Sequence, residues 1–374
     1  MKVLMLQDTR NYAGTEAHIL TLSKALRDFE RIDVEFLVPV QGELHKRGSD
    51  ERFRIHTATG GFFGFLVSAI RAVQSGRPDI IHTHNGRTTL IAVMVAKVFK
   101  CQVVATQHFL EPAHTVATGL VGRAKRAVHQ WVGHNVNIRI CVSHAAYQKM
   151  LERGDAIASD AANYAVIHNG IDIDGYKRRV SKSKITVYSE LGIDSESKLL
   201  VCAARLELEK NIDILLSAFK RIVDSGIKAQ LVIAGEGSQR NDLERQIVEF
   251  QISNCVKLLG FRSDVPDLIS AADSFVLPSS DEPFGLVLVE AMALGTPLVA
   301  AAAAGPLEIT DSGKYGHLFE PNNPDSLAET IVLVLGSARS VASEAKQIVT
   351  ERFSARQMAS STKLTYDNVI GTSK

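Results

Sequence analysis

Two carboxylates, Glu282 and Glu290, stand eight positions apart in the most informative segment of the chain. Glu290 lies in a run that is otherwise apolar from Leu286 to Leu294, and a buried carboxylate is costly unless a partner hydrogen-bonds it. Between them, Pro283 and Gly285 are typical of a tight loop that opens a helix, whose first backbone N–H groups form an anion site. If the first turn is helical, both carboxylates face one cleft. This combination predicts phosphate at the start of the helix and hydroxyl groups on the carboxylates, as in a sugar nucleotide.

Two cations and one small loop could bind the phosphates of such a ligand. Arg205 follows an apolar strand-like run, and Lys210 comes five residues later, just before another helix. The ends of strands in open α/β sheets bind ligands, and cations there stabilise a leaving diphosphate. The segment 14–16 follows the first strand and opens the first helix, so its N–H groups can also face phosphate. It lacks the Gly-x-Gly-x-x-Gly pattern of a dinucleotide fold, which counts against a dehydrogenase.

The spacing of Glu282 and Glu290 resembles the E-x7-E signature of retaining glycosyltransferases with the GT-B fold, in particular glycosyltransferase family 4. Further segments resemble that family in the same order along nearly the whole chain: Gly14–Glu16, His82–His84, Thr106–His108, Val142-Ser143, His168–Asp172, Arg205 with Lys210, Gly235–Gly237, Gly260-Phe261 and Gly305–Glu308. Three residues depart from the family pattern, namely Ala13, Asn211 and Ala304, each where the family usually has Gly.

The resemblance implies a role for each matching residue. The implied catalytic residues are His108 under the donor sugar, Glu282 beside it, and Arg205 and Lys210 on the diphosphate. The implied donor-binding residues are Gly14, Thr15, Arg205, Lys210, Gly235, Phe284, Gly285, Leu286 and Glu290, the last accepting hydrogen bonds from the ribose. His82 and His84 are assigned to the acceptor side, with a purely structural role as the alternative. No metal is expected, since Arg205 and Lys210 can replace a divalent ion. His-x-His also suggests a metal, but no further ligands are obvious.

Short apolar runs alternate with amphipathic ones, which predicts parallel α/β layers. We expect an α/β protein of GT-B fold, with two Rossmann-like α/β/α domains that face a cleft and a C-terminal helix that crosses back to the first domain. The expected domains are an acceptor-binding domain over 1–175, a nucleotide-sugar-binding domain over 176–353 and the returning helix over 354–374. The polar stretch 172–198 is interpreted as the connection between the domains.

Composition favours a soluble protein with two domains. The chain has 374 residues, of which 45% are hydrophobic and 22% charged, and its four scattered cysteines are typical of free thiols in a reducing compartment. The apolar stretch 286–305 is not expected to span a membrane, because it contains Glu290, Gly295 and Pro297. The start of the chain does not read as a signal peptide. We therefore expect a cytoplasmic protein.

Charge is distributed unevenly along the chain. Residues 1–180 hold 23 Lys and Arg against 16 Asp and Glu, whereas the remainder holds 19 against 25. Basic and apolar residues share the segment 115–134, which fits a peripheral helix on anionic lipid at the inner membrane, or an ordinary half-buried helix. No pattern for nucleic-acid binding is found.

The sequence thus predicts a retaining, metal-independent glycosyltransferase without a cofactor. It would transfer a sugar from a UDP- or GDP-sugar to a glycan or lipid-linked acceptor in cell-surface polysaccharide biosynthesis. Two alternatives remain, a nucleotide-sugar 2-epimerase of GT-B fold and a non-catalytic assembly protein that binds sugar nucleotides.

Overall fold

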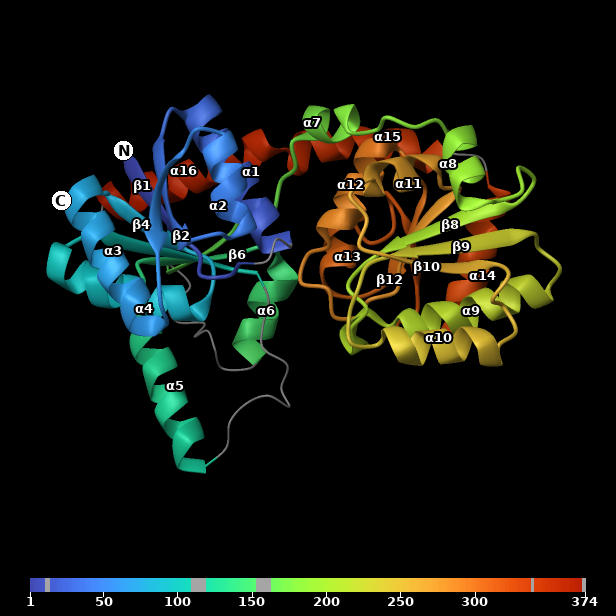
Figure 1. The fold of residues 1–374 in the computed structure, drawn as a ribbon, viewed down its shortest axis with the longest axis horizontal. Coiled ribbons are helices and arrows are strands. Elements are labelled where there is room, and N and C mark those ends of the chain that lie inside the picture. The colour runs from blue at the N-terminus through green and yellow to red at the C-terminus, as the bar shows by residue number, and fades with distance from the viewer. Residues whose placement is uncertain (11–13, 109–118, 153–162, 338–339, 372–374) are drawn as a thin grey trace. The chain divides into compact units, whose positions relative to one another are not determined.

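The computed structural model describes residues 1–10, 14–108, 119–152, 163–337 and 340–371 (Figure 1). They form two compact units, Met1–Gly170 with Ala355–Lys374, and Ile171–Ser354. These divisions fall within a few residues of the borders expected at 175/176 and 353/354. Each unit is described by itself below.

The first unit is built on a seven-stranded parallel sheet in the order β3-β2-β1-β4-β5-β6-β7. Its strands are β1 (Lys2–Leu6), β2 (Asp33–Pro39), β3 (Arg54–Ala58), β4 (Ile80–Thr83), β5 (Gln102–Gln107), β6 (Ile138–Cys141) and β7 (Tyr164–Val166). The helices are α1 (Gly14–Glu30), α2 (Glu43–Asp50), α3 (Phe62–Gly76), α4 (Gly86–Phe99), α5 (Gly119–His134), α6 (His144–Glu152) and α16 (Ala355–Gly371). Helices cover both faces of β1, so that Val3 and Leu4 pack into two different apolar clusters.

The second unit contains a six-stranded parallel sheet in the order β10-β9-β8-β11-β12-β13. Its strands are β8 (Lys198–Ala203), β9 (Ala229–Ala234), β10 (Val256–Gly260), β11 (Ser274–Leu277), β12 (Leu298–Ala301) and β13 (His317–Phe319). Its helices are α7 (Ile173–Arg178), α8 (Lys184–Leu191), α9 (Ile212–Asp224), α10 (Arg240–Glu249), α11 (Val265–Ala271), α12 (Leu286–Leu294), α13 (Ala304–Ile309), α14 (Pro324–Gly336) and α15 (Ser340–Arg352). The inner strand β8 is completely buried from Leu199 to Cys202, as expected of a parallel strand covered on both faces.

The polar stretch 172–198, interpreted above as the connection between the domains, belongs to the second unit. It folds into α7 and α8, which begin at the N-cap residues Asp172 and Ser183. Its apolar side chains Tyr176, Val187 and Tyr188 are buried, whereas Ile185 is 81% exposed. Between the two helices, the buried carboxylate of Asp267 accepts hydrogen bonds from the backbone N–H groups of residues 181 and 182. A few apolar anchors and helix caps therefore fold a segment whose composition is mostly polar.

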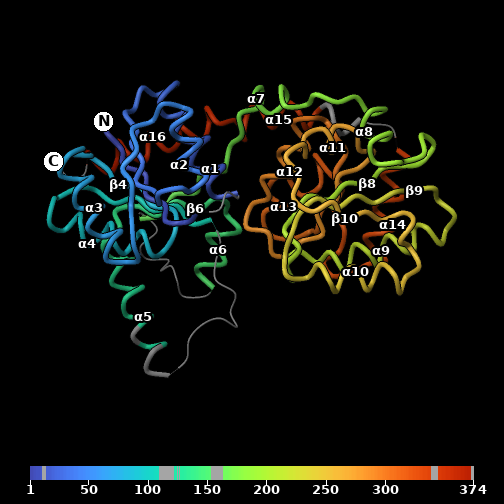
Figure 2. The backbone as a smooth tube through the Cα atoms, viewed as in Figure 1, coloured from blue at the N-terminus to red at the C-terminus, as the bar shows by residue number. Residues whose placement is uncertain are grey.

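The last helix of the chain, α16, belongs to the first unit and packs along α1 (Figures 1 and 2). The buried hydroxyl of Tyr366 lies 2.6 Å from Nδ1 of His82 at the end of β4. The other ring nitrogen of His82 lies 2.7 Å from Oγ1 of Thr106 on β5. This polar chain connects the returning helix to two strands of the sheet.

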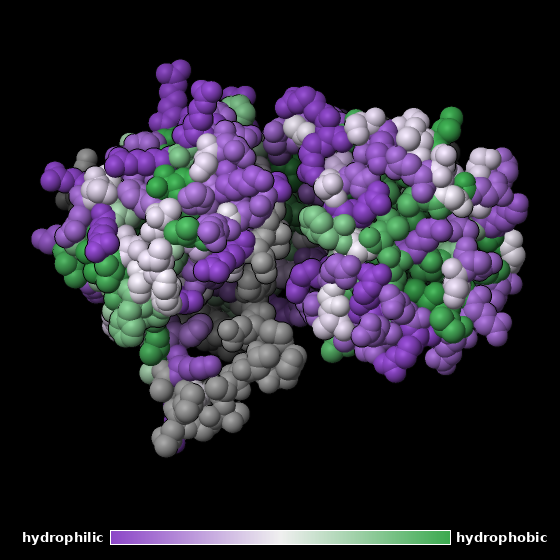
Figure 3. Space-filling model, in the orientation of Figure 1, coloured by the Kyte–Doolittle hydropathy of each residue, from purple (hydrophilic) through white to green (hydrophobic). Residues whose placement is uncertain are grey.

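Exposed apolar side chains gather on the helices of the first unit that cover one face of its sheet. Figure 3 shows apolar surface, in green, over α3 and α4. The residues are Phe63 and Val67 on α3 and Met94 and Val98 on α4. No described helix is both long and apolar enough to cross a bilayer.

Replacing Tyr366 by Phe should lower the free energy of unfolding by about 1–3 kcal/mol. The substitution removes one partner of a buried pair and leaves Nδ1 of His82 without it, which costs the desolvation of that nitrogen. Urea unfolding followed by circular dichroism measures the effect. Leu364→Ala, at a position of the same helix that is 63% exposed, is the matched control and should change stability by less than about 0.5 kcal/mol. Equal stability of Tyr366→Phe and wild type would contradict a structural role for this hydrogen bond.

Candidate functional site

The sheet of the second unit reverses its direction of winding between β8 and β11. From β8 the chain proceeds to β9 and β10 on one side, and then returns to β11, β12 and β13 on the other. The loops after β8 and β11 lie at the carboxyl ends of the two strands beside this reversal, which is where open α/β sheets bind ligands. Arg205 and Lys210 lie in the loop after β8, and Glu282 lies in the loop after β11.

An ion pair between Lys210 and Glu282 crosses this point of reversal. Nζ of Lys210 lies 2.6 Å from Oε2 of Glu282, and the two side chains are only 13% and 16% exposed. Nearby, the hydroxyl of Ser279 donates to the carbonyl oxygen of Glu209 at 3.0 Å. The loop after β8 and the loop after β11 are thus connected by this ion pair and by the hydrogen bond from Ser279.

Asn211 supplies a further contact between these loops. It adopts a left-handed backbone (φ 51°), which Asn tolerates better than most residues other than Gly. Its side chain does not cap α9 but donates to Oγ of Ser280 at 2.9 Å. The backbone conformation explains why Asn can stand where the family pattern has Gly, and the side chain adds a hydrogen bond that Gly cannot make.

Arg205 is placed differently from Lys210. Its side chain is 63% exposed and pairs with Glu209 at 2.8 Å. A surface pair of this kind contributes little to stability, so its guanidinium can turn to another anion at small cost.

The loop before α12 is held by close backbone packing. The N–H of Gly305 donates to the carbonyl oxygen of Glu282 at 3.0 Å, and a Cβ at Gly305 would approach the backbone oxygen of Phe284 to 2.3 Å. Gly285 has φ 101° and precedes the helix, which begins at Leu286. The first turn of a helix has N–H groups without intrahelical partners, and these bind anions. Phe284 itself is buried against Phe353.

Gly235 directly follows β9, at a point where two loops approach closely. A Cβ there would lie 1.8 Å from the carbonyl oxygen of Ala204, the residue before Arg205. Its N–H donates to the carbonyl oxygen of Gly260 at 2.8 Å. This glycine therefore sets the distance between the loop that carries Arg205 and the neighbouring strand ends.

Glu290 has a partner of its own and does not pair with the cations. The hydroxyl of Tyr176 on α7 donates to Oε2 of Glu290 at 2.9 Å. Burial raises the pKa of Glu290 to about 7, and the Tyr176 hydrogen bond and nearby Arg179 offset only part of this effect. The condition under which both carboxylates would face one cleft, a helical first turn from Glu282, is not met, because α12 begins at Leu286. Glu282 and Glu290 thus lie in different local environments.

The first unit places polar side chains at its own point of reversal, between β1 and β4. Gly14 and Thr15 begin α1, whereas Ala13 lies outside the described residues. Glu16, only 4% exposed, accepts hydrogen bonds from Gln7 and Thr9. The side-chain NH2 of Asn85 donates a hydrogen bond to Oε1 of Gln7 at 2.5 Å, and its side-chain oxygen caps α4 by accepting from the N–H of Thr88. Gln7 and Asn85 were not identified from the sequence, although the position of Gln7 directly after the apolar strand β1 was an available signal.

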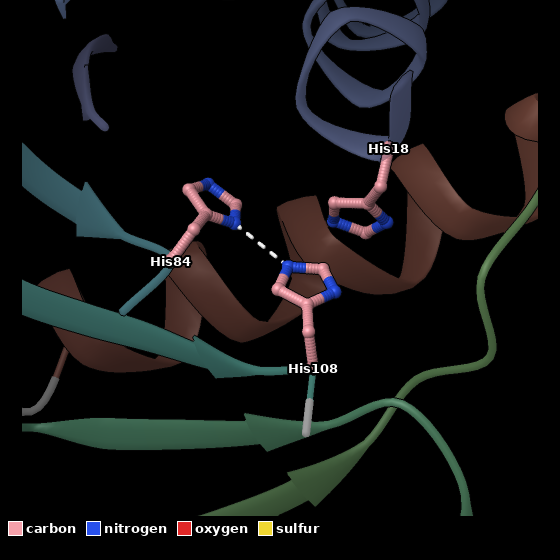
Figure 4. A group of neighbouring side chains, drawn as sticks. All are labelled: His18, His84 and His108. Carbon is pink, nitrogen blue, oxygen red and sulfur yellow. Dashed lines mark hydrogen bonds between the residues drawn. The ribbon is translucent and has the colours of Figure 1, made fainter. Parts of the chain in front are cut away.

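Three histidines from α1, the end of β4 and the end of β5 converge beside this network, as Figure 4 shows for His18, His84 and His108. Nδ1 of His84 lies 3.1 Å from Nε2 of His108. Burial lowers the pKa of all three imidazoles, that of His18 to about 4, so the rings are neutral at pH 7. His84 and His108 were predicted to lie near the reaction, whereas His18 was not identified.

The ring of His82 stacks on that of His84, with 4.5 Å between the ring centroids, but its two nitrogens have structural partners. Both of its ring nitrogens are engaged by Tyr366 and Thr106, and burial lowers its pKa to about 3. Its assignment to the acceptor side stays a prediction that these hydrogen bonds do not support.

Comparisons with known proteins place both halves of the chain. Residues 12–174 match the family model for Glycosyltransferase Family 4, and residues 184–348 match the model for Glycosyl transferases group 1. An uncharacterized glycosyltransferase of Methanocaldococcus jannaschii is 29% identical over 94% of this chain and 90% of its own length. The UDP-Gal:alpha-D-GlcNAc-diphosphoundecaprenol alpha-1,3-galactosyltransferase of Escherichia coli is 25% identical over 72% of this chain and 69% of its own.

Among solved structures, that of Anabaena HepE in complex with UDP and glucose superposes with a TM-score of 0.84. The alignment covers 98% of this chain and 100% of that one at 23% identity. This likeness confirms the predicted fold of two Rossmann-like α/β domains.

Replacing Glu290 by Gln should raise the melting temperature at pH 8 and have little effect near pH 5. The pKa of Glu290 is raised from 4.5 to about 7 in the folded state, so the stability that this group contributes is present below pH 4.5 and lost as pH rises through 7. Gln removes the cost of a buried charge at high pH while keeping an oxygen for Tyr176. Thermal melts across this pH range provide the measurement.

Glu249→Gln, at an exposed position of α10, is the control and should change the melting temperature little at either pH. A destabilised Glu290→Gln at pH 8 would show that burial does not disfavour the Glu290 carboxylate.

Proposed function

The chain belongs to the family 4 glycosyltransferases of GT-B fold, and from this premise we propose that it transfers a sugar from a nucleotide diphosphate sugar with retention of configuration. The acceptor is a glycan or a lipid-linked saccharide in cell-surface polysaccharide biosynthesis. The observation that carries this proposal is the Lys210–Glu282 pair at the reversal point of the second sheet, which sets a cation and a carboxylate where a ligand would bind.

The positions of the charged groups support a specific division of labour. Breaking the bond between sugar and diphosphate builds negative charge on the leaving phosphate, which prepositioned cations stabilise. Lys210 is fixed by its pair with Glu282, whereas Arg205 is exposed and can turn to the phosphate. The N–H groups at the start of α12 add a third source of positive potential. With these devices, the proposed reaction needs no divalent metal.

Glu282 and Glu290 serve different parts of the donor in this proposal. Glu282 lies beside the leaving-group cation, which suits contact with the sugar hydroxyls. Glu290 lies further along α12 and would accept hydrogen bonds from the ribose, in exchange for the one from Tyr176. His108 and His84, at the strand ends of the first unit, would face the sugar and its acceptor.

We propose a UDP-sugar as the donor and GDP-sugars as the alternative. The E. coli relative uses UDP-Gal by its name, and the Anabaena structure contains UDP and glucose. The name of the E. coli relative also specifies a diphosphoundecaprenol acceptor, which favours a lipid-linked saccharide here.

A lipid-linked acceptor would require contact with a membrane surface, and we propose that α5 provides it. Arg123 and Lys125 are exposed on this helix, together with Val128 and Trp131, each 45% exposed. A helix with basic and apolar side chains on its surface binds anionic lipid headgroups. The apolar side chains of α4, which packs against α5, and of α3, which packs against α4, would extend the same contact.

Thermal melts with UDP-, GDP-, ADP- and dTDP-sugars, with and without EDTA, test the donor site first. We expect stabilisation by the UDP-sugars that EDTA does not remove, because a bound ligand stabilises the folded state. Lys210→Ala should abolish this shift and lower kcat/KM for sugar transfer about 10²–10³-fold, the usual cost of losing one group that stabilises developing charge.

Lys228→Ala, at a side chain that is 70% exposed in the same unit, is the matched control and should behave as wild type. Wild-type transfer by correctly folded Lys210→Ala would remove Lys210 from the site, and a shift that EDTA abolishes would contradict metal independence.

Binding to lipid vesicles tests the role proposed for α5. Vesicles with anionic phosphatidylglycerol should bind the protein more tightly than neutral vesicles, and salt should weaken the binding. Arg123→Ala with Lys125→Ala should weaken it about thirtyfold, since each basic residue contributes about 1 kcal/mol. Lys198→Ala with Lys228→Ala, which removes two exposed cations elsewhere, is the control. Equal losses in both pairs would exclude a specific contact through α5.

A further inference from the structure

The histidine cluster of the first unit contains more buried polar atoms than its hydrogen bonds satisfy. Both ring nitrogens of His18 and Nε2 of His84 are buried without a hydrogen-bond partner among the described residues. Oδ1 of Asn169 is also buried and unpaired. It lies close to His18, but the two side chains do not have the geometry of a hydrogen bond. Such orphaned groups are rare in folded proteins, and each calls for a partner such as a water or an ion.

The arrangement of the rings identifies the kind of partner. One ring nitrogen from each of His18, His84 and His108 lies within 4.8 Å of the others, and the rings come from three separate elements (Figure 4). Three imidazoles and an open position form a common ligand set for Zn²⁺, with metal–nitrogen distances of about 2.0–2.1 Å. We propose that these three histidines form a binding site for a transition metal ion of the Zn²⁺ class.

The distances suit such an ion after a small adjustment. Ligand atoms at the corners of a tetrahedral Zn²⁺ site lie about 3.4 Å apart. Nδ1 of His84 and Nε2 of His108 are already 3.1 Å apart. The ring of His18 has to approach by less than about 1.5 Å, given bonds of this length. The ion replaces the His84–His108 hydrogen bond with two metal bonds.

The surroundings favour this ion over Mg²⁺ or Ca²⁺. Imidazole nitrogen suits Zn²⁺, Cu²⁺ and Ni²⁺, whereas Mg²⁺ and Ca²⁺ prefer oxygen ligands. His18 is 5% and His84 2% exposed, and this burial keeps the rings neutral, which is the form that binds metal. Asn169 supplies the usual outer partner, because metal-bound histidines donate their second N–H to a nearby oxygen. One ion therefore accounts for both unpaired nitrogens of His18 and for the unpaired oxygen of Asn169.

A metal here would act on the enzyme rather than take part in the transfer. It occupies Nε2 of His108, the ring predicted to face the donor sugar, and so would inhibit transfer. This inhibitory consequence rests on the proposed function, whereas the test below does not.

Titration of metal-free protein with Co²⁺, in the absence of nucleotide and acceptor, tests the site directly. Tetrahedral Co²⁺ absorbs visible light, so we expect one equivalent of bound ion with that spectrum, and calorimetry should give one equivalent of Zn²⁺. His84→Gln and His108→Gln should each weaken Zn²⁺ binding more than tenfold. Asn169→Ala should weaken it about tenfold through loss of the outer partner.

His129→Gln, at an exposed position of α5, is the matched control and should bind Zn²⁺ as wild type does. Melts of each variant without metal separate loss of a ligand from loss of the fold, and the partly buried His108 is the safer of the two ligand positions. Failure of wild type to bind one equivalent of either ion, or unchanged affinity in folded His108→Gln, would overturn the proposal.

Discussion

Burial of the parallel strands on both faces is the constraint that determines where most of the candidate functional residues lie. Residues 199–202 of β8 and 3–6 of β1 are almost completely buried. Polar side chains that must remain available to a ligand therefore cannot lie along these strands, because burying them there without a partner is costly. They lie instead just past the carboxyl ends, in the loops where the direction of winding reverses. Both units obey this constraint, although one gathers an ion pair at its reversal point and the other gathers neutral imidazoles. The same backbone architecture therefore supports two chemically different sites.

The two carboxylates of the E-x7-E segment show how a short motif is divided by local structure. Glu282 lies in a loop fixed by the N–H of Gly305 and has a lysine as its partner. Glu290 lies within α12, where only the hydroxyl of Tyr176 and the more distant Arg179 offset its burial. Burial makes the carboxylate of Glu290 easier to protonate by raising its pKa, and the hydrogen bond from Tyr176 offsets only part of this effect. The two glutamates of the motif are therefore identical in residue type but differ in the partners that surround their carboxylates.

The apolar periodicity was sufficient to predict most of the strands, because buried parallel strands are nearly continuous apolar runs. It failed for β3, whose residues Arg54, His56 and Thr57 are polar, and for the three-residue β13. It also did not indicate α7 and α8 in the stretch 172–198. The motifs predicted Lys210 and Glu282 individually, but their ion pair depends on the strand order, which a single sequence does not display.

His18 was missed because it is one histidine on an amphipathic helix and gains significance only when β4 and β5 bring two others to it. Asn211 and Ala304 looked like departures from a glycine pattern, yet both adopt left-handed backbones (φ 51° and 45°), so the conformation is kept while the residue changes.

The placement of α16 has a consequence for how the protein acquires its structure during synthesis. The second unit is continuous in sequence, from Ile171 to Ser354, whereas the first is completed only by a helix that follows it. On the ribosome, residues 1–170 emerge first but lack the helix that covers α1 and engages His82. The second unit can fold as soon as its own last strand and helices have emerged, because domains generally fold as units during translation. The apolar face of α1 therefore stays uncovered while 184 residues of the second unit are being made, and for that interval the nascent chain is a natural client for chaperones.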